Sequence, residues 1–268
     1  MGVSPVYIDE WHQFSRREDG RSRASLRLSG WHRGFDVPAR ALRLPPSPRG
    51  TPLSPPSASI WPKLTPPVEH FLGQCAALHM TFFEALSHAT ANAPRIADKD
   101  ALARVCDISL RRYLALVAEL ERHKLDRTDV MEPHLLGVEE FERRTMGADW
   151  HEQVASAHVT IGFLTDFWMR LAGGLPSPTR EAVQAALGEG DLQTPLHRIV
   201  EGQIAANPRL SSRLALWCRR LVGDTMLQAR SALVFHGDHA REEAQIEPVF
   251  TELIAAHTRR MDRLGLTA

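Results

Sequence analysis

From Val68 to about Arg263, apolar residues recur at steps of three and four along extended segments that few glycines or prolines interrupt. This spacing gathers them on one face of an α-helix, whereas a half-buried strand would need apolar and polar residues in alternation. Alternating runs bounded by turn dipeptides are absent from the sequence. The sequence therefore predicts an all-α fold, with several antiparallel helices packed as a bundle.

The helix boundaries follow from the breakers and from the polar residues before each apolar stripe. Asp98 and Asp149 are expected to cap helices, Pro133 is expected in a connector, and Gly173 with Gly174 should end a helix. The expected helices cover residues 68–93, 98–124, 138–144, 149–171, 177–188, 194–206, 207–233 and 241–263.

Residues 1–67 differ in composition from the rest of the chain. They hold 11 of the 18 prolines, and 10 basic residues against 5 acidic ones. Proline cannot donate a backbone hydrogen bond, and no periodic apolar face is present to bury. We therefore predict a disordered tail over residues 1–67 and one helical domain over residues 68–268, with a basic RNA-binding or partner-binding arm as the alternative for the tail.

Composition also restricts the class of protein. The 32 basic and 32 acidic residues balance, so overall charge favours neither nucleic acid nor a membrane surface, although RNA stays open as a partner. No apolar run approaches the ~20 residues that span a bilayer. Cys75, Cys106 and Cys218 show no paired spacing, which favours reduced, buried thiols. A cytoplasmic protein is expected.

Several strings resemble one family of helical proteins. These are LALWCRRLVGD at residues 214–224, IADKDALA at residues 96–103, FEAL at residues 83–86 and Asp149-Trp150. They are similar to segments of bacterial ferritin-like proteins related to the tRNA 2-methylthio-N6-isopentenyladenosine hydroxylase. The resemblance implies a ferritin-like antiparallel bundle with extra helices, over residues of about 68–235. It also implies a two-iron oxygenase site, in which two helices each give one acid and two others each give an acid-x-x-His pair.

The residues at the family's ligand positions do not have that chemistry. The first acid falls on His79, and the first acid-x-x-His pair falls on residues 109–112, which begin with Ser109 and end with Arg112. The second acid falls near Ile161, and the last pair falls on residues 189–192, from Glu189 to Leu192. A permanently charged guanidinium at Arg112 would stand beside two metal cations, and it could instead pair with Glu189 or another inward acid, Asp166 being the second choice.

A count of histidines supports the same conclusion without an alignment. None of the 13 histidines has glutamate three residues before it, and the only Asp-x-x-His runs from Asp9 to His12 in the predicted tail. His79, His88 and His158 are the core-helix histidines to weigh as ligands of a rearranged metal site, with Glu84 one turn from His88. Hydrogen-bonded histidines are more common than such ligands.

The resulting hypothesis is a ferritin-like, tRNA hydroxylase-like protein with a degenerate di-iron site that acts as a non-oxygenase, in a binding, structural or metal-free pocket role. Its candidate pocket comprises His79, Ser109, Arg112, Ile161, Glu189 and Leu192. No cofactor is expected. One alternative is a metal-dependent hydroxylase of a nucleoside or small molecule, with iron held by His79 and Glu189. Another is a repurposed metal-free enzyme, with Arg112 holding an anion. A small molecule in the bundle and a homodimer are the partners left open.

Overall fold

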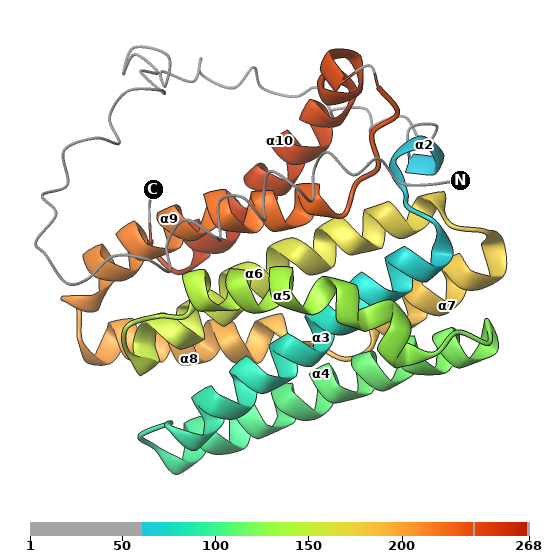
Figure 1. The fold of residues 1–268 in the computed structure, drawn as a ribbon. Helices are drawn as coiled ribbons and strands as arrows, with labels where there is room; N and C mark the ends of the chain where they lie inside the picture. The colour runs from blue at the N-terminus through green and yellow to red at the C-terminus, as the bar shows by residue number, and fades with distance from the viewer. Residues whose placement is uncertain (1–60, 238, 267–268) are drawn as a thin grey trace, which may run out of the picture. The chain divides into compact units, whose positions relative to one another are not determined.

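The computed structural model describes residues 61–237 and 239–266, and this part of the chain is helical without a strand. Figure 1 shows the arrangement. The helices are α2 (Trp61–Leu64), α3 (Val68–Ala91), α4 (Ile96–Arg122), α5 (Arg127–Thr145), α6 (Trp150–Leu171), the 3-10 turn η1 (Ala172–Gly174), α7 (Ser177–Gly188), α8 (Gln193–Ala206), α9 (Leu210–Ser231) and α10 (His239–Arg263). The prediction of an all-α, ferritin-like bundle is confirmed.

The centre of the bundle consists of α3, α4, α6 and the consecutive pair α7 and α8. The beginning of α6 lies at the end of α3, where Trp150 Nε1 donates to the carbonyl oxygen of Ala89 at 2.8 Å, so these two helices are antiparallel. Helices α9 and α10 cover α6 from outside. Trp217 on α9 donates to the Ser156 hydroxyl at 2.8 Å, and Phe250 on α10 stacks on Phe167.

Helix α5 crosses from the end of α4 to the beginning of α6. We expected a connector and a short helix over residues 138–144, and this is wrong, because one helix continues through Pro133. Asp126 caps it by accepting hydrogen bonds from the amides of Thr128 and Asp129. Pro133 is exposed and lacks the backbone donor of one helical hydrogen bond, while the buried side chains of α5 keep the helix packed on α3.

Helices α3 and α5 approach each other closely at Gly73. A Cβ atom at this position would lie 2.0 Å from the carbonyl oxygen of Val130. Figure 1 shows the two helices side by side, and farther along them Phe82 and Phe141 line the same cavity. The two helices therefore run in the same direction, and α6 runs antiparallel to α3.

Two other boundaries differ from expectation. Residues 61–67 were assigned to the disordered tail, but Trp61 and Leu64 are buried and Thr65 Oγ1 donates to the carbonyl oxygen of Leu171 at 2.8 Å. Two large apolar side chains are enough to hold this segment on the bundle. The remaining predicted tail, residues 1–60, lies outside the described residues. Asp98 does not cap α4, which begins two residues earlier, and its carboxylate pairs with Arg95 Nε at 2.7 Å.

The apolar core runs through the whole bundle and includes the fully buried side chains of Phe71, Phe163, Phe167 and Trp168. Among the helices of residues 61–237 and 239–266, none is long and apolar enough to cross a membrane.

Candidate functional site

Four of the six residues predicted to share a pocket lie together where α4 faces α3 and the end of α7. The Ser109 hydroxyl donates to the carbonyl oxygen of His79 at 3.5 Å. Arg112 Nε donates to the carbonyl oxygen of Glu189 at 2.9 Å, and Arg112 Nη2 to that of Gly190 at 3.2 Å. His79, Ser109 and Arg112 are buried. We call these four residues, His79, Ser109, Arg112 and Glu189, the Arg112 cluster.

The ion pair expected for Arg112 is wrong. The Glu189 carboxylate pairs with Arg111 Nε at 3.3 Å, and Asp166 pairs with Arg260. Arg112 instead bonds backbone carbonyls just after α7. The carbonyls at the end of a helix carry partial negative charge, so they attract a cation without needing a carboxylate.

Burial controls the charges in the Arg112 cluster. It lowers the pKa of Arg112, while the nearby carboxylates of Glu189 and Asp191 oppose this shift. Burial, with a smaller effect of Arg112, lowers the pKa of His79 to about 3, so the imidazole is neutral. Burial also raises the pKa of the Cys75 thiol. The cluster thus combines a cation and a neutral imidazole, with the neutral Cys75 thiol nearby and without a carboxylate bonded to the cation.

The other two predicted residues, Leu192 and Ile161, are buried apolar side chains on other elements. Leu192 is buried just before α8, and Ile161 lines a cavity on the other side of α6 and α3. His79 and Glu189 were the alternative metal ligands. The Glu189 carboxylate instead pairs with Arg111. Within the described residues, no three His, Cys, Asp or Glu side chains converge as metal ligands. These side chains do not fit the donor set of a two-iron centre.

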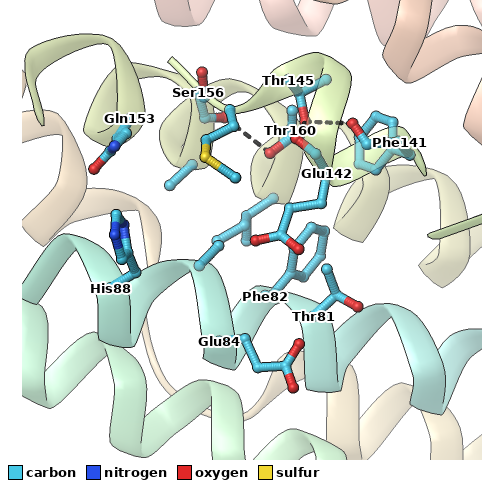
Figure 2. Close-up of a pocket in the computed structure, with 14 residues that line it drawn as sticks. Thr81, Phe82, Glu84, His88, Phe141, Glu142, Thr145, Gln153, Ser156 and Thr160 are labelled. Atoms are coloured by element: carbon cyan, nitrogen blue, oxygen red, sulfur yellow. Dashed lines mark hydrogen bonds between the residues drawn. The ribbon is translucent and has the colours of Figure 1, made fainter. Parts of the chain in front are cut away.

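The cavity with Ile161 lies between α3, α5 and α6 and has a volume of about 270 Å³. Its surface is mostly apolar, with polar side chains from all three helices around it (Figure 2). Figure 2 shows how the three helices contribute. The lining residues are Thr81, Phe82, Glu84, Ala85 and His88 on α3, Phe141, Glu142 and Thr145 on α5, Met146 after it, and Gln153, Ser156, Ala157, Thr160 and Ile161 on α6.

The threonine hydroxyls of the cavity donate to the helices that carry them. Thr81, Thr145 and Thr160 each donate to the carbonyl oxygen four residues earlier, at 3.2, 2.9 and 2.8 Å. Ser156 Oγ accepts a hydrogen bond from Trp217 at 2.8 Å. A threonine oxygen whose hydrogen is used in this way can still accept. The hydroxyl groups therefore offer mainly acceptors to a bound molecule.

Two carboxylates add negative charge to this cavity. Glu142 reaches from α5 toward Glu84 and His88 on α3, as Figure 2 shows. Partial burial raises the pKa of Glu142, and the negative charges of Glu84 and Glu139 raise it further, while His88 acts in the opposite direction. Gln153 Oε1 is buried and accepts no hydrogen bond from the described residues. The cavity therefore has acceptors and repelling carboxylates whose electrostatic cost a bound cation would reduce.

This cavity was not predicted from the sequence. Glu84 and His88 were weighed only as possible ligands of a rearranged metal site, one turn apart on α3, and Glu142 was not considered. Because α5 was predicted to begin eleven residues too late, its packing along α3 was not expected.

Comparison with known proteins places the described helices in a family. The sequence profile of the Ferritin_fold-like family, described as "Ferritin-like domain, actinomycetes", matches residues 63–240. The chain belongs to this ferritin-like family. The match includes α3 through α9, and with them both the Arg112 cluster and the cavity. No curated protein matches the chain.

Proposed function

We propose that this ferritin-like chain is a cytoplasmic, non-oxygenase binding protein that holds a small apolar molecule with a protonated amine in the cavity between α3, α5 and α6. In this proposal it descends from tRNA hydroxylase-like di-iron proteins and has lost their metal site. The observation that carries the proposal is the combination of apolar walls, unused acceptors and the two interacting carboxylates of Glu84 and Glu142 in one cavity of about 270 Å³.

The Arg112 cluster supports the loss of oxygenase chemistry. Iron ligands in such bundles are carboxylates and imidazoles from facing helices. Here a buried guanidinium donates to two backbone carbonyls, beside an imidazole whose pKa is lowered to about 3. A fixed positive charge would repel two divalent cations at short range in a medium of low dielectric constant. The three buried free cysteines agree with a reducing compartment.

The cavity's polar groups support a cationic ligand. The amine would lie between Glu142 and Glu84, where it would offset the repulsion that helps to raise the pKa of Glu142. The apolar part of the ligand would contact the uncharged side chains of Phe82, Phe141 and Ile161. An anion of the same size would meet two carboxylates and few donors.

Calorimetric titration with phenethylamine tests this proposal, with 3-phenylpropionate as the acid of similar size and shape. We expect saturable binding of one amine per chain and binding of the acid that is at least about tenfold weaker, because one like-charge contact removes that much affinity. Glu142→Gln should weaken amine binding at least about tenfold. Glu132→Gln, on the exposed side of the same helix, makes the same change in net charge and should leave it unaltered.

Three results would overturn the proposal. The first is equal affinity for the amine and the acid, and the second is unchanged amine binding by the Glu142→Gln variant. The third is tight binding of iron by protein purified from iron-supplemented cells, with a rise in melting temperature on loading, since a ligand of the native state must stabilise it. That last outcome would favour the metal-dependent hydroxylase instead.

A further inference from the structure

A second pocket, which we call the α10 pocket, lies between α6, α8 and α10 on another side of the bundle. Its volume is about 300 Å³. His158 comes from α6 and the remaining side chains from α8 and α10, and its two α10 residues lie beyond the part of the chain that matches the ferritin-like family. The lining residues are His158, Gln193, Thr194, His197, Arg198, Glu201, Arg260 and Arg263.

Positive charge dominates the α10 pocket. Three arginines line it against one glutamate, Glu201, and because Arg260 pairs with Asp166 the formal excess is +1 with neutral histidines. Arg198 and Arg263 are exposed, and neither forms an ion pair with another residue of the described chain. Arg198 also lines a neighbouring hollow with Asp98 and Asp100, and Arg263 lines another with Asp262.

Arg260 forms the buried wall of this pocket and is only 8% exposed. Its Nη2 donates to the carbonyl oxygen of Gly162 at 3.0 Å and to the carboxylate of Asp166. Its Nη1 is buried and has no hydrogen-bond partner within the described residues. A Cβ at position 162 would lie 3.0 Å from Arg260 Nε, so a glycine here makes room for the guanidinium. An unmade hydrogen bond of a buried charged donor is costly, and a bound acceptor would remove that cost.

His158 provides a second buried group without a partner. The residue is 3% exposed, and its Nε2 makes no hydrogen bond to the described chain. On the other side of the ring, the Gln193 amide nitrogen lies 3.1 Å from Nδ1 when the amide is oriented to satisfy both of its groups. This hydrogen bond makes Nδ1 the acceptor and leaves the proton on Nε2, which is therefore a donor.

We propose that the α10 pocket binds the phosphate group of a small phosphate monoester. Donors from three helices line the pocket: Arg260 and Arg263 on α10, Arg198 on α8, and His158 on α6. A phosphate monoester has three terminal oxygens and a charge of about −2, so it accepts hydrogen bonds from several directions and attracts Arg198 and Arg263, which have no ion pair within the described chain. A carboxylate is planar and is satisfied by one guanidinium fork, which would leave the other donors unused.

Calorimetric titration of the full chain with glycerol 1-phosphate tests the proposal, with succinate as the carboxylate arm and with chloride holding ionic strength constant. We expect saturable binding of one phosphate ester per chain and at least about tenfold weaker binding of succinate. Arg263→Gln should weaken phosphate binding about tenfold or more. Glu201→Gln should strengthen it several-fold, because it removes the one negative charge in the pocket.

Arg209→Gln is the matched control, since this exposed arginine lies outside the pocket and its loss changes net charge equally. Its phosphate affinity should stay within about twofold of the wild type. Arg260 is left unchanged because its loss would also unpair Asp166. Absence of saturable phosphate binding, tighter binding of succinate, or equal weakening by Arg209→Gln and Arg263→Gln would each overturn the assignment. Circular dichroism of each variant verifies that it is folded.

Discussion

At the scale of single residues, Arg112 shows how a charge is accommodated inside a helical bundle without an ion-pair partner. Its guanidinium bonds two backbone carbonyls at the end of α7, at 2.9 and 3.2 Å. The same contact joins α4 to the junction of α7 and α8, where the chain leaves one helix and begins the next. Arg112 therefore donates hydrogen bonds to two carbonyl oxygens and also fixes the position of that junction.

We predict that Arg112→Ala lowers the free energy of unfolding by about 2 to 4 kcal/mol, because it removes two partly buried hydrogen bonds to carbonyls and opens a cavity where the buried side chain was. Arg112→Met should cost less, since it fills most of the volume and removes the desolvated charge. Arg111→Ala, the exposed neighbour, should cost less than about 1 kcal/mol. Urea denaturation measures all three. An effect of Arg111→Ala as large as that of Arg112→Ala would show that the carbonyl contacts matter little.

At the scale of helices, the contact between α3 and α5 determines the shape of the cavity. Gly73 lets the α5 backbone approach α3, because any side chain there would meet the carbonyl of Val130. Farther along α5, Phe141, Glu142 and Thr145 form one wall of the cavity. A shift of α5 at its beginning would therefore move the wall at its end.

Gly73→Ala should reveal this coupling. The added Cβ would lie 2.0 Å from a backbone oxygen that cannot rotate away, so we expect a loss of about 1 to 3 kcal/mol in unfolding free energy. Gly137→Ala is the control, since nothing lies within 4 Å of a Cβ on that exposed glycine of α5. It should gain about 0.5 to 1 kcal/mol from helix propensity. Urea denaturation compares the two, and a stabilising Gly73→Ala would show that α5 adjusts freely.

The helices were more predictable from sequence than the sites between them. The periodicity of apolar residues in α3, α4 and α6 indicates which face each helix buries, and this was sufficient to predict a helical bundle. Glu142 could not be placed, because Pro133 was interpreted as a helix breaker and α5 was shortened. Arg112 was expected to be buried, and it is. Its partners are backbone carbonyls, and because every residue has one, the residue type does not indicate which carbonyl will bind the guanidinium.

The α10 pocket was missed for a similar reason. His158 was weighed as a ligand on its own helix, whereas Arg260 and Arg263 lie about a hundred residues later. Only the packing of α10 on α6 brings them together, and the match between faces of distant helices is not encoded in local spacing.

At the scale of the whole molecule, buried neutral histidines tie the stability of the bundle to pH. His79 on α3, His158 on α6 and His257 on α10 are all buried. Burial lowers the pKa of His79 and His158 to about 3 and that of His257 to about 4, and nearby arginines add to the effect in each case. In the unfolded chain each histidine should titrate near pH 6.5. The unfolded state therefore binds more protons than the folded state between these values.

This difference predicts the direction of acid unfolding. The stability associated with the three histidines is fully present above pH 6.5 and is lost as pH falls toward 4 and then 3, with a limiting slope of roughly 4 kcal/mol per pH unit for three protons. Urea denaturation at several values between pH 7 and pH 5 measures the slope before most carboxylates titrate. His257→Gln should lower the slope by at most roughly 1.4 kcal/mol per pH unit, the contribution of one proton, and half-buried His134, whose pKa burial also lowers, should keep part of the slope in every variant. A stability that stays constant over this range would mean that the three imidazoles accept protons inside the folded bundle.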